Sequence, residues 1–240
     1  MKITFLGTRG YIDSRNDRHY HHAATLVSYY GRDVMIDCGE DWEDDVFDVS
    51  PDAIVITHAH PDHAYGLRNG APCPVWATKK AWEKLSQYPL ESSHTVKHRE
   101  PVEIEGITFE AFPVAHSTIA PAVGYRITAG RVTIFYVPDV VYIEDREAAL
   151  TGCRRYIGDA ATLSVSMVRK PDNTLIGHTP MRTQLTWCQK FGIPEAIFTH
   201  CGSHIVDGDE AEVNAKLREM AAERGVKATI AHDGDELILR

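Results

Sequence analysis

Five apolar runs in this chain are each followed at once by a histidine or an aspartate, and this repetition is the strongest constraint on its fold. The runs AIVIT, ITFEAFPVA, VTIFYVP, TLIG and AIFT precede His58, His116, Asp139, His178 and His200. Backbone at the ends of packed strands is rigid, whereas the loops beyond are open to solvent. The pattern therefore predicts a strand-rich core that gathers imidazoles and carboxylates at one edge.

The densest part of the pattern is His58-Ala59-His60-Pro61-Asp62-His63, with four potential metal ligands in six positions. Pro61 disfavours helix at the residue before it and can begin one itself, so His58 and His60 should lie on an extended turn. Asp62 and His63 should open a helix. Because side chains alternate along extended backbone and rotate around a helix, the two pairs can face two adjacent metals.

Other apolar runs and helical periodicities indicate an α/β fold. Strands are predicted at residues 2–6, 24–29, 32–37, 53–57, 107–112, 123–128, 131–137, 196–199 and 235–239, with hairpin turns at Tyr30-Gly31 and Ala129-Gly130. Helices are predicted at 78–87, 179–191 and 207–224; in the second, Thr179 should cap the start and Gly192 should end it. Strands outnumber helices, which fits a two-sheet core covered by outer helices. We expect residues 1–240 to form a single domain.

Composition limits the kinds of substrate and partner that we expect this protein to bind. The net charge of −9 gives no overall attraction for polyanions, so we expect a small-molecule substrate and no nucleic acid. Five cysteines without a CxxC pair argue against a disulfide framework or a structural zinc knuckle. No run approaches the roughly 18 apolar residues of a membrane span, and the first apolar stretch is too short for a signal peptide. We expect a cytoplasmic protein without membrane contact, and a homodimer is compatible with the sequence.

The HxHxDH motif at residues 58–63, followed by single histidines and an aspartate at strand ends, resembles the metallo-β-lactamase superfamily. The resemblance runs from FLGTRG and IDCGED to the final HDGDEL. It implies a four-layer αββα sandwich and a hydrolase with two metals. It also implies three groups of ligands: His58, His60 and His116 on the first metal; Asp62, His63 and His200 on the second; and Asp139 bridging both.

Nitrogen and oxygen ligands without a thiolate suit Zn²⁺, and also Mn, Fe or Ni; zinc is the metal that we predict. Two such cations would lower the pKa of a shared water and would neutralise the oxyanion of the transition state.

His178, in GHTPMRTQL, is the most informative further residue. In the phosphodiesterase branches of the superfamily, similar to tRNase Z and the cyclic phosphodiesterases of phosphonate breakdown, a histidine here contacts the scissile phosphate and assists the leaving group. Such a general acid contributes about 10²–10⁴-fold. The alternative is a helix-start histidine bonded to Thr179 or to backbone. We predict Asp62 and His178 as the catalytic residues.

The substrate predicted with them is a small, cyclic or nucleotide-like phosphodiester. Residues 117–138 leave no room for the inserted tRNA-binding arm of tRNase Z enzymes.

For several residues the sequence allows both a functional and a purely structural interpretation. Asp37 and Asp159, at the ends of RDVMID and RYIGDA, can accept the second ring N–H of a metal-binding histidine or can cap a turn. Arg126 can bind a phosphate through two N–H groups or can be a solvated strand residue. His204 can line the pocket or lie in a loop. The remaining histidines divide into a group that could touch substrate (His19, His21, His22) and a group of surface or turn residues (His94, His98, His232).

Two alternatives stay open at this level. A lactonase or thioesterase, resembling the acyl-homoserine lactonases or glyoxalase II, would attack a carbonyl, would not need His178, and would often use a tyrosine. A non-hydrolytic metal-binding protein on the same fold is the second. Flavodiiron proteins, one such class, have glutamate in place of the second motif histidine and carry a flavodoxin domain, whereas this chain has His60 and only 240 residues.

Overall fold

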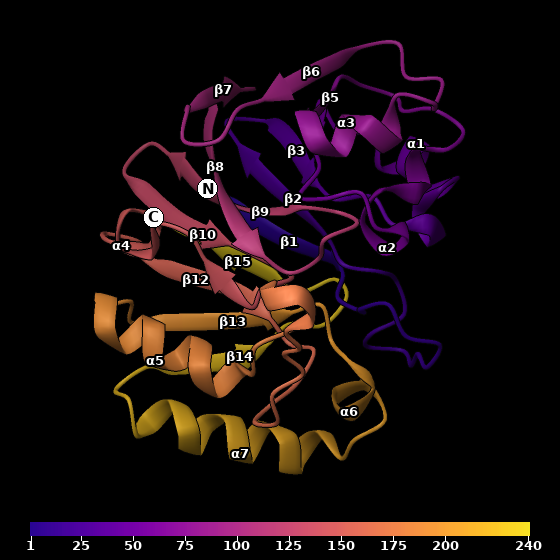
Figure 1. Cartoon of the computed structure of the whole chain (residues 1–240). Helices are drawn as coiled ribbons and strands as arrows, with labels where there is room; N and C mark the ends of the chain where they lie inside the picture. The colour runs from indigo at the N-terminus through magenta and orange to yellow at the C-terminus, as the bar shows by residue number, and fades with distance from the viewer.

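The computed structural model describes residues 1–240 as two β-sheets packed face to face, with helices on both outer faces (Figure 1). In the first sheet the strand order is β15 (Glu236–Ile238), β1 (Lys2–Gly7), β2 (Ala24–Tyr29), β3 (Arg32–Ile36), β4 (Ala53–Val55), β5 (Val75–Thr78) and β6 (Ser93–Val96). Pairing is antiparallel from β15 to β3 and parallel from β3 to β6.

The second sheet follows the same plan of antiparallel and then parallel pairing. Its order is β11 (Tyr142–Ile143), β8 (Ile107–Ala115), β9 (Ala122–Ala129), β10 (Val132–Tyr136), β12 (Arg155–Asp159), β13 (Glu195–Thr199) and β14 (Lys227–Ile230), and β7 (Val102–Ile104) also pairs with β8. β10, β12, β13 and β14 are parallel. Parallel strands place their carboxyl ends at one edge, which is where open α/β sheets bind ligands.

Three apolar clusters separate the layers. The middle one joins the two sheets and includes Ile3, Phe5, Phe109 and Tyr125. A second packs the outer face of the second sheet against α4 (Arg146–Leu150), α5 (Met181–Phe191) and α7 (Glu210–Ala222); a third packs the first sheet against α1 (Asp45–Val49), α2 (Pro61–Ala64) and α3 (Lys79–Leu85). The order helix, sheet, sheet, helix confirms the predicted four-layer α/β sandwich.

Local sequence explains several boundaries. Tyr30 and Gly31 both have positive φ (50° and 77°), as a two-residue type I′ hairpin requires, and they join β2 to β3 as predicted. Gly192 ends α5 in the left-handed region, also as predicted. α6 (Ser203–Val206) and the short 3₁₀ turns η1 (Glu40–Trp42), η2 (Tyr65–Leu67) and η3 (Pro171–Asn173) complete the elements.

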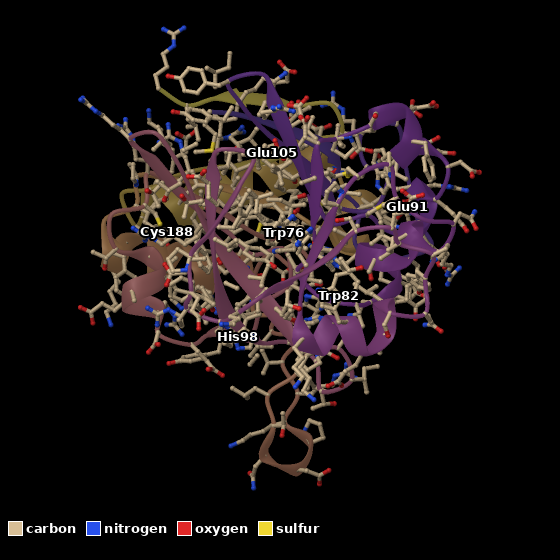
Figure 2. The ribbon with its side chains drawn as sticks, turned by 90° about the horizontal axis from the view of Figure 1, so that it is seen from above. Trp76, Trp82, Glu91, His98, Glu105 and Cys188 are labelled. Atoms are coloured by element: carbon tan, nitrogen blue, oxygen red, sulfur yellow. The ribbon has the colours of Figure 1, made fainter.

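Two local predictions were wrong. The apolar run TLIG before His178 is not a strand of either sheet: Ile176 pairs with Arg169, so the run belongs to a loop that folds back on itself. This segment between β12 and α5 stands clear of the body in Figure 2. Thr179 does not cap α5, because the N-cap residue is Pro180 and the Thr179 N–H donates to the Val140 carbonyl.

The strands β5, β6, β7, β11 and β14, each of two to four residues, were not predicted, and β12 was predicted only as the run RYIGDA that contains Asp159. We infer that residues 1–240 form one domain, since β15 near the C-terminus pairs with β1. None of the helices combines the length and the apolar character that a membrane crossing needs.

Candidate metal centre

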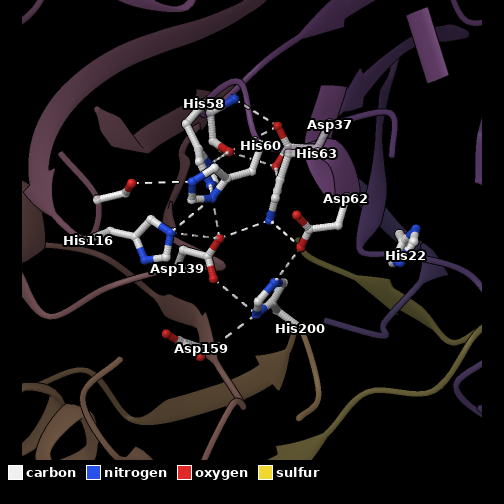
Figure 3. A network of polar contacts seen from close by, with 12 residues as sticks. His22, Asp37, His58, His60, Asp62, His63, His116, Asp139, Asp159 and His200 are labelled. Atoms are coloured by element: carbon white, nitrogen blue, oxygen red, sulfur yellow. Dashed lines mark hydrogen bonds and ion pairs between the residues drawn. The ribbon is translucent and has the colours of Figure 1, made fainter. Parts of the chain in front are cut away.

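Side chains that follow four strands meet at one edge of the sandwich (Figure 3). The first sheet supplies the four motif residues after β4, at the start of α2. The second sheet supplies His116 after β8, Asp139 after β10 and His200 after β13. All of these residues but His60 are buried. The structure thus brings together the seven residues that the family resemblance implies as metal ligands.

The first group consists of three imidazoles and one carboxylate. The Nδ1 atom of His60 lies 2.9 Å from Nε2 of His58 and 3.3 Å from Nε2 of His116. Oδ2 of Asp139 lies 3.2 Å from Nε2 of His58 and 3.7 Å from Nε2 of His116. Four potential ligand atoms therefore surround one point.

The second group shares Asp139 with the first. Oδ2 of Asp62 lies 3.0 Å from Nε2 of His200 and 3.2 Å from Nε2 of His63. Asp139 reaches both histidines, with Oδ2 at 2.8 Å from Nε2 of His63 and Oδ1 at 3.0 Å from Nδ1 of His200. Asp139 is thus placed between the two groups, where a bridging carboxylate would lie.

Buried polar atoms without hydrogen bonds test whether this arrangement suits cations. Although they lie close to one another, Nε2 of His63, Oδ1 of Asp139 and Nδ1 of His200 are buried without a well-aligned hydrogen bond. Leaving such atoms unsatisfied costs about 1–3 kcal/mol each. Divalent cations prefer nitrogen and carboxylate ligands of this kind. The residues therefore fit a pair of divalent metal ions, and we propose that they hold them.

The protonation states support the same reading. Burial lowers the pKa of His58 well below its usual value, and burial together with the charge of His116 lowers the pKa of His60 to about 4. Both rings are therefore neutral near pH 7 and have lone pairs to offer. For His63, burial opposes the charged form, but the carboxylates of Asp62, Asp139 and Asp37 raise its pKa well above the usual value. The carboxylates thus stabilise a positive charge at this point. A bound metal ion would replace the proton as the source of that charge.

Neighbouring polar groups fix the orientation of the rings. The Nδ1–H of His63 donates to Asp37 Oδ2 over 2.8 Å, and the Thr57 N–H donates to Asp37 Oδ1 over 2.7 Å. Asp37 is fully buried, and burial raises the pKa of its carboxyl. The Nδ1–H of His116 donates to the Gly177 carbonyl over 3.1 Å. Such bonds fix the tautomer so that Nε2 faces the metal. The functional reading of Asp37 therefore has geometric support.

His178 lies beside this centre, paired with Asp159. Its Nδ1 lies 2.8 Å from Asp159 Oδ2, and Asp159 also accepts the backbone N–H groups of Val140 and Ala161. Burial opposes protonation of His178, but the charges of Asp159, Asp139 and Asp62 outweigh it and raise its pKa to about 9. Without metal, these carboxylates therefore favour the protonated form of His178, and its ring is bonded to Asp159, not to Thr179.

The structure contradicts the phosphate-binding reading of Arg126. Its Nη1 donates to the carbonyls of Ala149 and Thr151, each over 2.9 Å, where α4 ends. Carbonyls at the end of a helix lack partners within it, and the guanidinium satisfies them here. Arg126 is therefore structural and does not reach the cavity.

The histidines before β2 also stabilise structure and do not line the metal-centre cavity. Nδ1 of His19 lies 2.7 Å from Thr8 Oγ1, the His21 ring lies 4.5 Å from the ring of Trp42, and Nδ1 of His22 lies 3.0 Å from Asp41 Oδ1. His204 is exposed and lines a smaller cavity of about 390 Å³ that adjoins the centre.

A cavity of about 1010 Å³ opens over the metal centre. Five residues of the centre (His60, Asp62, His116, Asp139, His200) and the neighbouring His178 line it, together with residues that the sequence analysis missed: Tyr11, Ser117, Ile119, Met167 and Arg169. These lie in loops without periodicity. Ser117 follows His116 directly, and its Oγ lies 3.2 Å from His60 Nε2, so adjacency to a ligand was the one available signal.

Comparison with known proteins identifies the class. The beta-lactamase superfamily domain matches residues 32–201, and the chain belongs to this superfamily.

Among its relatives, ribonuclease Z of Methanopyrus kandleri is 30% identical over 179 residues, which cover 65% of this chain and 62% of the relative, so the chain spans less than two thirds of that protein. The metallo-beta-lactamase fold protein YhfI of Bacillus subtilis has a TM-score of 0.77 at 17% identity, over 98% of each chain. A diphosphatase of the PhnP family has a TM-score of 0.71 at 21% identity, over 100% of this chain and 98% of that one.

Proposed function

We propose that this protein is a metal-dependent hydrolase that cleaves a small phosphodiester, cyclic or nucleotide-like, with zinc in both metal positions. The observation that carries the proposal is the position of His178, whose Nδ1 lies 2.8 Å from Asp159 Oδ2 beside the seven-residue centre. The similarity to ribonuclease Z and to a PhnP-family diphosphatase supports a phosphate ester over a carboxylic ester.

Each part of the centre then has a chemical role. Two bound cations would lower the pKa of a water and would neutralise charge on the phosphate. Asp62 lines the cavity and can accept the proton of the attacking water. The second ring nitrogen of His178 has no protein hydrogen bond, so its N–H can donate a proton to the leaving oxygen. Asp159 holds the imidazole in place and stabilises its charge.

The surroundings favour a small substrate over a long polyanion. The net charge is −9, and the turn between β8 and β9 spans only residues 116–121, without an inserted arm. The cavity of about 1010 Å³ is large enough for a nucleotide-sized molecule.

The test is metal analysis followed by activity on two substrate classes. We expect about two divalent ions per chain, zinc foremost, and hydrolysis of bis-p-nitrophenyl phosphate. His178→Ala should lower kcat by about 10²–10⁴-fold on a diester with an alkoxide leaving group, such as a 2′,3′-cyclic nucleotide, and should leave lactone hydrolysis unchanged. His98→Ala, an exposed histidine outside the cavity, is the matched control. Equal losses on both substrates, or a loss on lactones alone, would remove the phosphodiesterase proposal.

The lactonase or thioesterase alternative has one observation in its favour. Tyr11 lines the cavity, and its hydroxyl has no protein hydrogen bond that would prevent it from polarising a carbonyl. In that case Tyr11→Phe would lower lactone hydrolysis strongly and would leave phosphodiester hydrolysis unchanged. The non-hydrolytic alternative predicts bound metal without hydrolysis of either substrate.

A further inference from the structure

Two cavities meet at the metal centre. The smaller, of about 390 Å³, shares Tyr11, Met167, His178 and His200 with the larger. The histidines His60 and His116 line only the larger cavity. A phosphodiester bound at the shared histidines has two ester substituents, or arms. Each of the two cavities offers space for one of them.

The smaller cavity is uncharged apart from its histidines. Its lining contains no lysine, arginine, aspartate or glutamate, and glycine, alanine and hydroxyl side chains make up most of the rest. By contrast, the larger cavity contains Arg169 and the two carboxylates of the centre. With His178 engaged by the scissile phosphate, a charged arm would lose hydration in the smaller cavity without gaining a further ion-pair partner, so an uncharged arm suits it better.

Three large apolar side chains that line the smaller cavity are exposed. Tyr11 is 63% exposed, Val165 71% and Met167 49%, although such residues are usually buried. They come from two distant segments, the loop after β1 and the projecting segment between β12 and α5 (Figure 2). Exposed apolar residues that converge on a cavity indicate a binding surface.

The backbone that carries Tyr11 is held in place. The Gly10 N–H donates to the Cys201 carbonyl over 2.9 Å, and the side chain of Arg9 donates to the Ile12 carbonyl over 2.5 Å. Arg9 is itself buried and bonded to Asp41 over 2.7 Å. The ring is therefore exposed on a fixed support, so a ligand pays little ordering entropy to pack against it.

Met167 is bonded through its backbone to His178, the candidate acid. Its backbone N–H donates to the His178 carbonyl over 3.2 Å, so the backbone that carries its side chain is held next to His178. A thioether packs favourably against aromatic rings and adapts to their shape. Tyr11 and Met167 thus provide one rigid and one adaptable contact next to the reacting group.

We propose that the smaller cavity is a subsite for a flat, uncharged ester arm such as an aryl group or a nucleobase, and that Tyr11 and Met167 determine this specificity. The inference rests on the proposed function, because it assumes a phosphate at the metal centre. It goes further in naming the chemistry of one substituent and the side chains that recognise it.

Equilibrium binding of phenyl phosphate and methyl phosphate to the zinc-loaded protein tests the subsite without hydrolysis. The two ligands share a charged group and differ only in the arm. We expect the wild type to bind phenyl phosphate more tightly. Tyr11→Ala should raise its Kd by roughly 10-fold, the size of one stacking contact, and should change the Kd of methyl phosphate less than 2-fold.

Three further variants make the outcome specific. Tyr11→Phe keeps the ring and should keep the preference for phenyl phosphate. Met167→Ala removes the contact that the other segment contributes and should reduce this preference. Tyr30→Ala, at a tyrosine that is 90% exposed in the β2–β3 turn, should change neither Kd. Met167→Ala also serves if Tyr11→Ala does not fold, as judged by circular dichroism.

The subsite is overturned if the wild type does not distinguish the two ligands, or if Tyr11→Ala changes both Kd values equally. Absence of phosphodiester hydrolysis, with the phenyl preference intact and dependent on Tyr11, would refute the proposed function and retain the subsite.

Discussion

Replacing Asp37 with asparagine tests whether ring orientation determines metal binding at the second group. In the protein, Asp37 accepts hydrogen bonds from the N–H and the hydroxyl of Thr57 and one from His63 Nδ1. Asparagine has a single oxygen. If that oxygen keeps the bond to the Thr57 N–H, the amide NH₂ faces His63 Nδ1, which must then accept. The proton of His63 moves to Nε2, the atom that lies 2.8 Å from Asp139 Oδ2.

The expected magnitude follows from this change of tautomer. Loss of a partner that orients a metal-binding histidine typically costs about 10–100-fold in affinity, or about 1.4–2.7 kcal/mol. The effect should fall on one metal only. The first group is oriented by the Gly177 carbonyl next to His116 and by the Thr57 hydroxyl next to His58, and the asparagine oxygen can keep the bond that this hydroxyl makes to residue 37.

Chelator competition with zinc on metal-free protein measures both binding steps. We expect one step to weaken by about 10–100-fold and the other to change less than 2-fold. Asp52→Asn is the matched control, because Asp52 also accepts a backbone N–H, from Asp33, but lies away from the centre. A folded Asp37→Asn protein in which both steps match the wild type would refute the reasoning.

Two further predictions concern stability. Burial opposes ionisation of Asp41, but hydrogen bonds from His22 and the charge of Arg9 outweigh it and lower its pKa. Asp41→Asn should therefore cost about 1.5–3 kcal/mol of unfolding free energy at pH 7, and urea titrations should show this difference shrinking as the pH falls below about 4; a difference that grows in acid would contradict it. In Gly39→Ala the new Cβ would lie 2.3 Å from the Asp62 carbonyl oxygen, so we expect a loss of about 1–3 kcal/mol and weaker zinc binding. An unchanged melting temperature would be evidence against this.

The convergence of the seven side chains could be predicted because each stands where an apolar run ends. The period of a strand and the chemistry of the next residue are both local features, so a single sequence reveals them. The same locality accounts for Asp37 and Asp159, which end their own strands beside the centre. The four layers followed from the balance of strands and helices together with the family resemblance.

What the sequence could not reveal depends on contacts between distant segments. Arg126 has the composition of a phosphate ligand, but it is occupied by the end of α4, a five-residue helix too short to be predicted. TLIG has the composition of a strand, but its Ile176 pairs with Arg169 within a loop. Tyr11 lies in a loop without periodicity, and only the folded chain shows that it borders both cavities.

The centre takes its side chains from both sheets, four from the first and three from the second. Between the sheets there is otherwise an apolar interface, with few polar links such as the Tyr125 hydroxyl to the Ile56 carbonyl. A pair of cations would therefore cross-link the two sheets. Neither sheet alone offers a full set of ligands, so the ions should bind only after the two sheets have packed together. Removing the ions should therefore destabilise the interface between the sheets before it destabilises either sheet.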